Sequence, residues 1–278
     1  MVDQDTGRWF LRTMILKGRN ATGMSQRIFG EEIFRSKDTI LDWEKGRVDV
    51  PPGMIEAIAS ACGHSDEVRD YMKAVAKARR AGVPVEADTR FNALFLALLE
   101  EFAGFIFKFD AMMIPGPLQK REYHFRVVRP ADPFALAESK DNGWPFKEER
   151  AEILEGRIDK PTMHFLIGET ALLQLRQISE DLYQDQMAHL RKWAKRRGVS
   201  IRILREPVLA RLSSFEIYME GGNPLACPTL VYTEIPDSSY LINDLSRIAS
   251  YDELRKKLWK MAIRIEVYQD DNGRVHLA

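Results

Sequence analysis

The sequence predicts an all-α N-terminal domain of about five helices, residues 1–84, followed by a mixed α/β (α+β) C-terminal domain, residues 85–278. Apolar residues recur at helical spacing in the first part, between breaks made by glycine and proline. In the second part, short runs of strand-forming residues alternate with helical patterns. The length of 278 residues agrees with two domains of roughly 150 residues each.

The helices of the N-terminal part are predicted from these breaks. The first covers residues 8–17 and ends in the glycine-containing stretch 18–23. Two short helices lie within residues 24–47, and two further helices cover residues 54–62 and 65–80. A glycine and a proline then interrupt the helical pattern, which places the domain boundary near residue 84.

Residues 24–47 have the pattern of two short helices joined by a tight turn. Ser25 and Ser36 each precede an apolar helical pattern and can accept a hydrogen bond from an N–H group of the first turn. Gly30 falls where the two helices would cross. Since glycine has no side chain, the two backbones can approach closely there. Gly46 follows the last apolar position and suits a left-handed C-cap. This is the sequence pattern of a DNA-binding helix-turn-helix.

The same stretch resembles the XRE family of lambda-repressor-like bacterial regulators. The family pattern is matched without a gap by Ser25-Gln26, Gly30, Ser36 and Trp43-Glu44-Lys45-Gly46-Arg47. The resemblance implies a sequence-specific DNA-binding regulator whose second motif helix enters the major groove. It also implies an ion pair between Arg19 and Glu44 that holds the motif together.

The resemblance places candidate DNA contacts on both motif helices. Gln26 and Arg47 are candidate phosphate contacts, while Lys37, Asp38 and Asp42 are candidate base readers. The full set of candidate DNA-binding residues is Gln26, Arg27, Arg35, Ser36, Lys37, Asp38, Thr39, Asp42, Lys45 and Arg47.

Two features depart from the family pattern. Phe34 stands in the turn where the family usually has glycine, and a positive φ at that position would cost a phenylalanine about 1 kcal/mol. Asp38 and Asp42 bring negative charge to the groove-facing side, although a carboxylate can accept a hydrogen bond from cytosine N4. Basic residues flank these carboxylates and can offset their repulsion of phosphates.

The charge of the chain bears on how strongly it would bind DNA. Lys and Arg total 41, as do Asp and Glu, so there is no global basic field. Residues 1–84 contain 14 Lys or Arg and 12 Asp or Glu, a surplus of only two. Because DNA affinity depends mostly on phosphate neutralisation, we expect one copy to bind weakly. We therefore expect a homodimer that reads two half-sites roughly 34 Å apart on double-stranded DNA.

Signatures of secreted, membrane and enzymatic proteins are missing from the sequence. It has no signal peptide and no apolar run of about 18 residues. Cys62 and Cys227 match no metal or redox spacing. There is no HExxH, phosphate-binding glycine loop or GxSxG motif, and the five histidines are scattered. We expect a cytoplasmic protein that is not an enzyme, with no metal, no cofactor and no membrane partner.

The C-terminal part mixes helices and strands. Helices are predicted over residues 89–105, 118–128, 148–156, 169–175, 182–197 and 251–265. Strands are predicted over residues 162–167, 199–205, 215–220 and 229–235, with a possible edge strand over residues 240–245. Pro115-Gly116-Pro117 forces a turn.

This part is similar to the C-terminal domain of actinobacterial regulators of the WhiJ type, over roughly residues 90–265. The matching features are IPGPLQ (114–119) with Tyr123, FLIGETAL (165–172), Gln186 with Leu190, the strand at 199–204, and VYTE (231–234). The resemblance implies transcriptional regulation, often with a small companion protein encoded nearby. It implies no ligand-binding residues. Glu169 and Glu234 could line a shared pocket, although Glu169 could equally begin a helix.

Three hypotheses of different classes follow. The first is a DNA-binding regulator whose C-terminal domain dimerises and senses a small-molecule effector or a partner protein. The second is an antitoxin-like interaction module with weak or no independent DNA binding, which Asp38 and Asp42 favour. The third is an enzyme whose site residues come together only in the fold.

Overall fold

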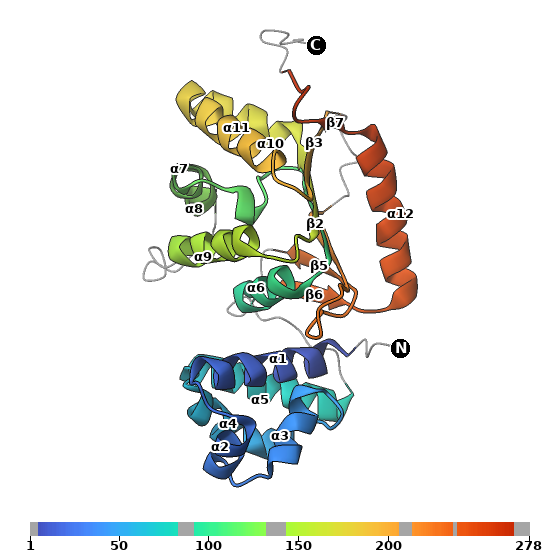
Figure 1. Ribbon diagram of the computed structural model, residues 1–278. Coiled ribbons are helices and arrows are strands. Elements are labelled where there is room, and N and C mark those ends of the chain that lie inside the picture. Colours follow the sequence, from blue (N-terminus) through green and yellow to red (C-terminus); the bar gives the residue numbers. More distant parts are fainter. Residues whose placement is uncertain (1–4, 83–91, 132–142, 206–212, 236–237, 270–278) are drawn as a thin grey trace.

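Five α-helices form the N-terminal part of the computed structural model, which describes residues 5–82, 92–131, 143–205, 213–235 and 238–269. They are α1 (Thr6–Ala21), α2 (Gln26–Glu32), α3 (Lys37–Glu44), α4 (Ile55–Cys62) and α5 (Asp66–Ala81), with a 3-10 turn η1 (Pro52–Met54) before α4. Figure 1 shows them as one bundle, with α1 and α5 nearest the rest of the chain. The predicted helical N-terminal part is confirmed.

The first helix is longer than predicted, because Gly18 does not end it. Gly18 lies inside α1 and faces α4, where a Cβ atom on residue 18 would come within 2.5 Å of the Cys62 Cβ. Such a separation is far below van der Waals contact. Glycine is therefore present at position 18 because α1 and α4 pack closely there.

The C-terminal part is built on a seven-stranded mixed sheet with the order β6-β5-β4-β1-β2-β3-β7. The strands are β1 (Phe105–Asp110), β2 (Thr162–Gly168), β3 (Val199–Leu204), β4 (Phe215–Met219), β5 (Leu230–Ile235), β6 (Ser238–Ile242) and β7 (Ile263–Arg264). β1, β2 and β3 are parallel neighbours, and the remaining pairs are antiparallel. The predicted α+β class is confirmed, and β6 lies at an edge of the sheet as expected.

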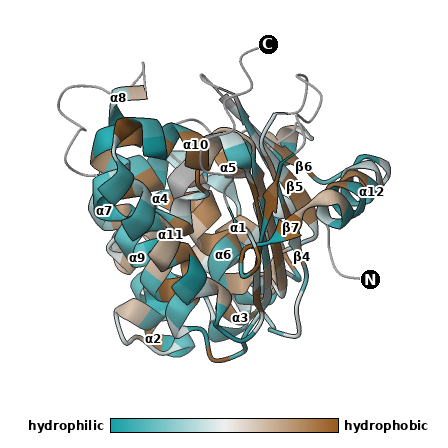
Figure 2. Cartoon of the chain, turned by 90° about the horizontal axis from the view of Figure 1, so that it is seen from above, coloured by the Kyte–Doolittle hydropathy of each residue, from teal (hydrophilic) through white to brown (hydrophobic). Residues whose placement is uncertain are grey.

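Helices cover both faces of the sheet. They are α6 (Asn92–Phe102), α7 (Arg121–Tyr123), α8 (Arg129–Ala131), α9 (Gly143–Gly156), α10 (Glu169–Ile178), α11 (Glu180–Ala194) and α12 (Leu245–Met261), with a 3-10 turn η2 (Gly116–Leu118) and a π-helical turn η3 (His124–Val128). α12 covers one face, and the other helices lie on the opposite face (Figures 1 and 2). Figure 2 shows apolar residues concentrated in the sheet between these two layers.

The largest correction concerns β1, since the helix predicted over residues 89–105 ends at Phe102, and residues 105–110, for which no strand was predicted, form a central strand. Phe107 and Phe109 face α12, while Ile106 and Lys108 face the opposite layer, and all four are buried. A strand that is buried on both faces gives a nearly continuous apolar run, which periodicity does not distinguish from a buried helix.

Several helix ends also differ from the predictions. The helix expected from residue 251 begins at Leu245, because the Asp244 side chain caps it, and residues 263–264 form β7 instead of its last turn. The helix expected from residue 118 begins at Arg121, after the 3-10 turn at the prolines.

The two parts of the chain share one hydrophobic core. Phe95 of α6 stacks on Phe10 of α1 with ring centroids 4.6 Å apart, and it meets the Tyr71 ring of α5 edge-on at 6.1 Å. The indole N–H of Trp9 donates to the Leu225 carbonyl at 3.0 Å. α6 therefore anchors the N-terminal bundle to the second part. The boundary expected near residue 84 lies outside the described residues and stays a prediction.

Candidate nucleic-acid interface

A buried ion pair holds α1, α2 and α3 together. The Arg19 Nε lies 2.5 Å from the Glu44 Oε1, and Arg19 also donates to the Met24 carbonyl at 2.6 Å. Gln26 donates from its amide nitrogen to the other Glu44 oxygen at 2.6 Å. The predicted Arg19–Glu44 pair is confirmed. Gln26, expected to contact a phosphate, joins this pair as a second hydrogen-bond donor.

The two motif helices start as the sequence predicts. The Ser25 hydroxyl accepts from the Ile28 N–H at 3.3 Å, and the Ser36 hydroxyl accepts from the Thr39 N–H at 3.1 Å. A Cβ atom on Gly30 would lie 2.5 Å from the Arg35 carbonyl oxygen, so only glycine lets the turn pack across α2. These contacts fix where α3 begins relative to α2.

The outer side of the motif is accessible to a partner. Seven of the ten candidate DNA-binding residues are exposed, namely Arg27, Arg35, Ser36, Lys37, Asp38, Lys45 and Arg47, while Gln26, Thr39 and Asp42 are half-buried. Ile40 and Trp43 on the inner side of α3 are buried. Figure 1 shows α2 and α3 at the end of the molecule farthest from the sheet. The second domain therefore leaves this surface uncovered.

Intramolecular contacts occupy some of the cations on this surface. Arg27 pairs with Glu31 at 2.5 Å and Arg47 pairs with Asp42 at 3.3 Å. The side chains of Lys37 and Lys45 form no hydrogen bond or ion pair among the described residues. Exposed pairs contribute only about 0–1 kcal/mol each, so phosphates can replace these carboxylates.

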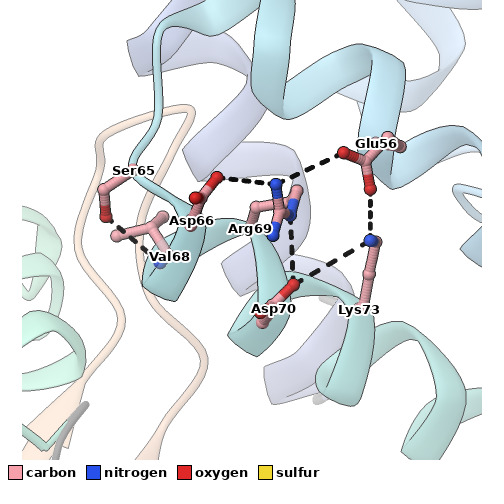
Figure 3. A network of polar contacts seen from close by, with 7 residues as sticks. All are labelled: Glu56, Ser65, Asp66, Val68, Arg69, Asp70 and Lys73. Atoms are coloured by element: carbon pink, nitrogen blue, oxygen red, sulfur yellow. Dashed lines mark hydrogen bonds and ion pairs between the residues drawn. The ribbon is translucent and has the colours of Figure 1, made fainter.

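A second group of charged side chains, on α4 and α5, forms its own closed network (Figure 3). Arg69 pairs with Asp66 at 2.6 Å, Asp70 at 3.0 Å and Glu56 at 3.3 Å. Lys73 pairs with Glu56 and with Asp70. The hydrogen bond from Lys73 lowers the pKa of Glu56. These five side chains carry three negative charges and two positive charges, so the network has a net negative charge and does not attract phosphates.

The C-terminal domain contains a buried charge network that the sequence analysis missed. Lys108 lies 2.7 Å from both Glu100 and Glu216, and it donates to the Tyr218 hydroxyl at 2.8 Å. Arg150 forms two bonds to Glu100, at 2.8 and 2.6 Å. Burial acts to raise the pKa of Glu100, but Arg150 and Lys108 together lower it. The available signal was the lysine in the middle of the otherwise apolar run FIFKF, residues 105–109.

The two glutamates proposed to share a pocket have separate partners. Glu169, the first residue of α10, accepts from the Tyr268 hydroxyl at 3.0 Å and pairs with Arg205 at 3.3 Å. Glu234 on β5 accepts from the Tyr232 hydroxyl at 3.1 Å. β4 and β1 lie between β5 and β2 in the sheet. No contact among the described residues joins the two glutamates, and the start of a helix accounts for Glu169.

The described residues contain no cluster of three or more His, Cys, Asp or Glu side chains arranged to hold a metal ion. Cys62 and Cys227 are buried thiols, and burial raises the pKa of each to about 12. Among the described helices, none has the length and apolar character needed to span a membrane.

Together, the fold and the exposed motif define a helix-turn-helix protein with a C-terminal α+β domain. Residues 17–72 match the family described as "Helix-turn-helix domain", which supports a DNA-binding regulator. Residues 95–266, well over half of the chain, match the family described as "Domain of unknown function (DUF5753)", and the protein belongs to this family. Comparison with curated proteins and with solved structures gave no match.

Proposed function

We propose that the protein is a sequence-specific transcriptional regulator that inserts α3 into the major groove of double-stranded DNA. The observation that carries this proposal is the buried Arg19–Glu44 pair with Gln26, because it sets the angle between α2 and α3 while the outer side of α3 stays exposed. The recognition helix of a helix-turn-helix contacts base edges with its N-terminal residues. The resemblance to the XRE family supports the same role.

The candidate residues divide by the chemistry they offer. Lys37, Asp38 and Asp42 are positioned for base edges, with Lys suited to guanine and Asp to cytosine N4. The phosphate contacts are assigned to Gln26, Arg27, Arg35, Ser36, Thr39, Lys45 and Arg47. The Gln26 amide nitrogen donates one of its two hydrogens to Glu44. The second hydrogen of that nitrogen can be donated to a phosphate.

We assign dimerisation and sensing to the C-terminal domain. Because the N-terminal part has a surplus of only two basic residues, we expect a single copy to bind DNA weakly. Two copies on adjacent half-sites would bind more tightly. The resemblance to WhiJ-type regulators supports a small-molecule effector or a small companion protein as the signal. α6 offers a route for that signal, since Phe95 packs in the N-terminal core and Glu100 lies in the buried charge network.

The test begins with selection of duplexes from a random library by the full-length protein. Affinity for the enriched duplex is then measured for the wild type, Lys37→Glu and a matched control, Lys192→Glu, which reverses an exposed lysine on α11. We expect a specific complex that weakens with salt, is abolished by the change at Lys37 and is unaffected by the change at Lys192. Equal affinities of all three proteins would refute the proposal.

The interaction-module alternative is favoured by one observation. Asp38 is exposed and Asp42 half-buried on the helix that would enter the groove, and both carboxylates repel phosphates. If no duplex is enriched and a small protein co-purifies with the chain, the interaction-module hypothesis replaces the regulator hypothesis.

A further inference from the structure

The turn between α2 and α3 contains a phenylalanine in a conformation that normally requires glycine. Phe34 has φ +56°, and the only other described non-glycine residue with positive φ is Lys160. For a side chain larger than hydrogen, this left-handed region brings the Cβ too close to a carbonyl oxygen. The strain lies two residues before Ser36, which caps the proposed recognition helix.

The ends of α2 and α3 have the same hydrogen-bond pattern, which allows a direct comparison. After α2, the Phe34 N–H donates to the Glu31 carbonyl and the Arg35 N–H to the Gly30 carbonyl, at 3.3 and 2.8 Å. After α3, the corresponding donors are the N–H groups of Gly46 and Arg47. This Schellman pattern favours glycine at the left-handed position. The chain has glycine after α3, and also after α4 and α5, but phenylalanine after α2.

No side-chain contact within the part of the chain that the structure describes compensates for the strain at Phe34. Its side chain is 89% exposed, so the ring gains almost no burial from folding. No ring stacking or cation–π contact involves Phe34 among the described residues. Arg35 donates to the Phe34 carbonyl, a contact that glycine would also allow. An uncompensated backbone outlier points to a function outside the fold.

We propose that the Phe34 ring contacts the C5-methyl group of a thymine at the edge of the site that α3 reads. This inference rests on the proposed DNA-binding function. Phe34 adjoins the N-terminus of α3, the end whose residues meet base edges in a helix-turn-helix. The thymine methyl is the apolar group that the major groove presents, and phenylalanine is among the side chains that contact it.

The surroundings of Phe34 favour DNA over a protein partner. Apart from the buried Ile33, its neighbours in the chain and at the start of α3 are exposed polar or charged residues, namely Glu31, Glu32, Arg35, Ser36, Lys37 and Asp38. A single aromatic ring among charges does not make the contiguous apolar patch of a protein interface. Arg35 and Lys37 beside the ring provide the positive charge that a phosphate backbone requires.

The experiment uses the enriched duplex and replaces each thymine in turn by uracil, which removes only the methyl group. Affinities are measured for the wild type, Phe34→Gly and the control Ile158→Gly, which removes a 94% exposed side chain from the C-terminal domain. Glycine at position 34 retains the turn, so this variant is expected to fold.

We expect wild type to lose about fourfold in affinity at one or two uracil positions, from roughly 0.8 kcal/mol per methyl and 1.4 kcal/mol per tenfold change. Phe34→Gly should bind the thymine duplex about fourfold more weakly. At those positions, replacement of thymine by uracil should not change the affinity of Phe34→Gly. The control Ile158→Gly should have the wild-type affinity for every duplex.

Two results would overturn the inference while leaving DNA binding intact. One is wild-type affinity of Phe34→Gly for the thymine duplex. The other is a variant that binds more weakly but keeps the full response to uracil, and a changed oligomeric state would then assign Phe34 to a contact between copies. If wild type enriches no duplex, both this inference and the proposed function fail.

Discussion

Replacing Glu44 by glutamine tests whether the buried pair holds the motif together. The substitution preserves the shape of the side chain but removes its charge, and the Glu44 and Arg19 side chains are only 4% and 11% exposed. Two charge-assisted hydrogen bonds, from Arg19 and Gln26, are weakened. Removing one partner of a buried pair costs about 3–5 kcal/mol. Because Arg19 keeps its bond to the Met24 carbonyl, we expect Glu44→Gln to lower the free energy of unfolding by about 3 kcal/mol, the lower end of that range.

The assay is urea denaturation followed by circular dichroism at neutral pH. The matched control is Glu31→Gln, which breaks the Arg27–Glu31 pair on the surface of the same motif. Both partners of that pair are about 60% or more exposed, so its loss should cost less than about 1 kcal/mol. If Glu44→Gln is no less stable than this control, the pair does not organise the motif and the reasoning is wrong.

Two further predictions concern the link between the domains and the buried charge network. Phe95→Ala should lower the free energy of unfolding by about 3–5 kcal/mol, because the ring is buried against Phe10 and Tyr71. The control Leu173→Ala truncates a half-exposed side chain and should cost far less. Calorimetry of both variants checks this, and similar losses of stability would contradict the shared core. Glu100→Gln should also destabilise the protein at neutral pH. Since the folded state lowers the pKa of Glu100, the stabilisation is complete above the ordinary glutamate value of 4.5 and is lost as the pH falls through the lower folded value. The stability difference between Glu100→Gln and wild type should therefore shrink on acidification in denaturation titrations, and a pH-independent difference would refute this role for Glu100.

The motif was predictable from sequence because its determinants are local. Ser25 and Ser36 cap helices that begin one residue later, and these caps depend only on neighbouring backbone N–H groups. The Arg19–Glu44 pair joins residues far apart in the chain, and only the resemblance to a known family predicted it. The sequence also showed that Phe34 stands where the family pattern usually has glycine. Its positive φ and its exposure could be determined only from the structure.

The centre of the second domain was not predictable in the same way. β1 pairs with β2 and β4, which are distant in sequence, and its burial on both faces removes the alternation that identifies a strand. The position of Lys108 between Glu100 and Glu216 follows from those pairings. The separation of Glu169 from Glu234 likewise depends on the order of the strands, which local patterns do not determine.

The salt dependence of affinity for the enriched duplex tests the central claim most directly. Four exposed cations assigned to phosphates, Arg27, Arg35, Lys45 and Arg47, surround the reading side of the motif. If each neutralises one phosphate, the slope of log affinity against log salt approaches about −0.9 per contact, or roughly −3.6 for one protomer. We predict a slope of this order for wild type and a slope smaller by about one for Lys45→Ala. Affinity that does not change with salt, or a slope that Lys45→Ala leaves unaltered, would contradict DNA binding through this side of the motif.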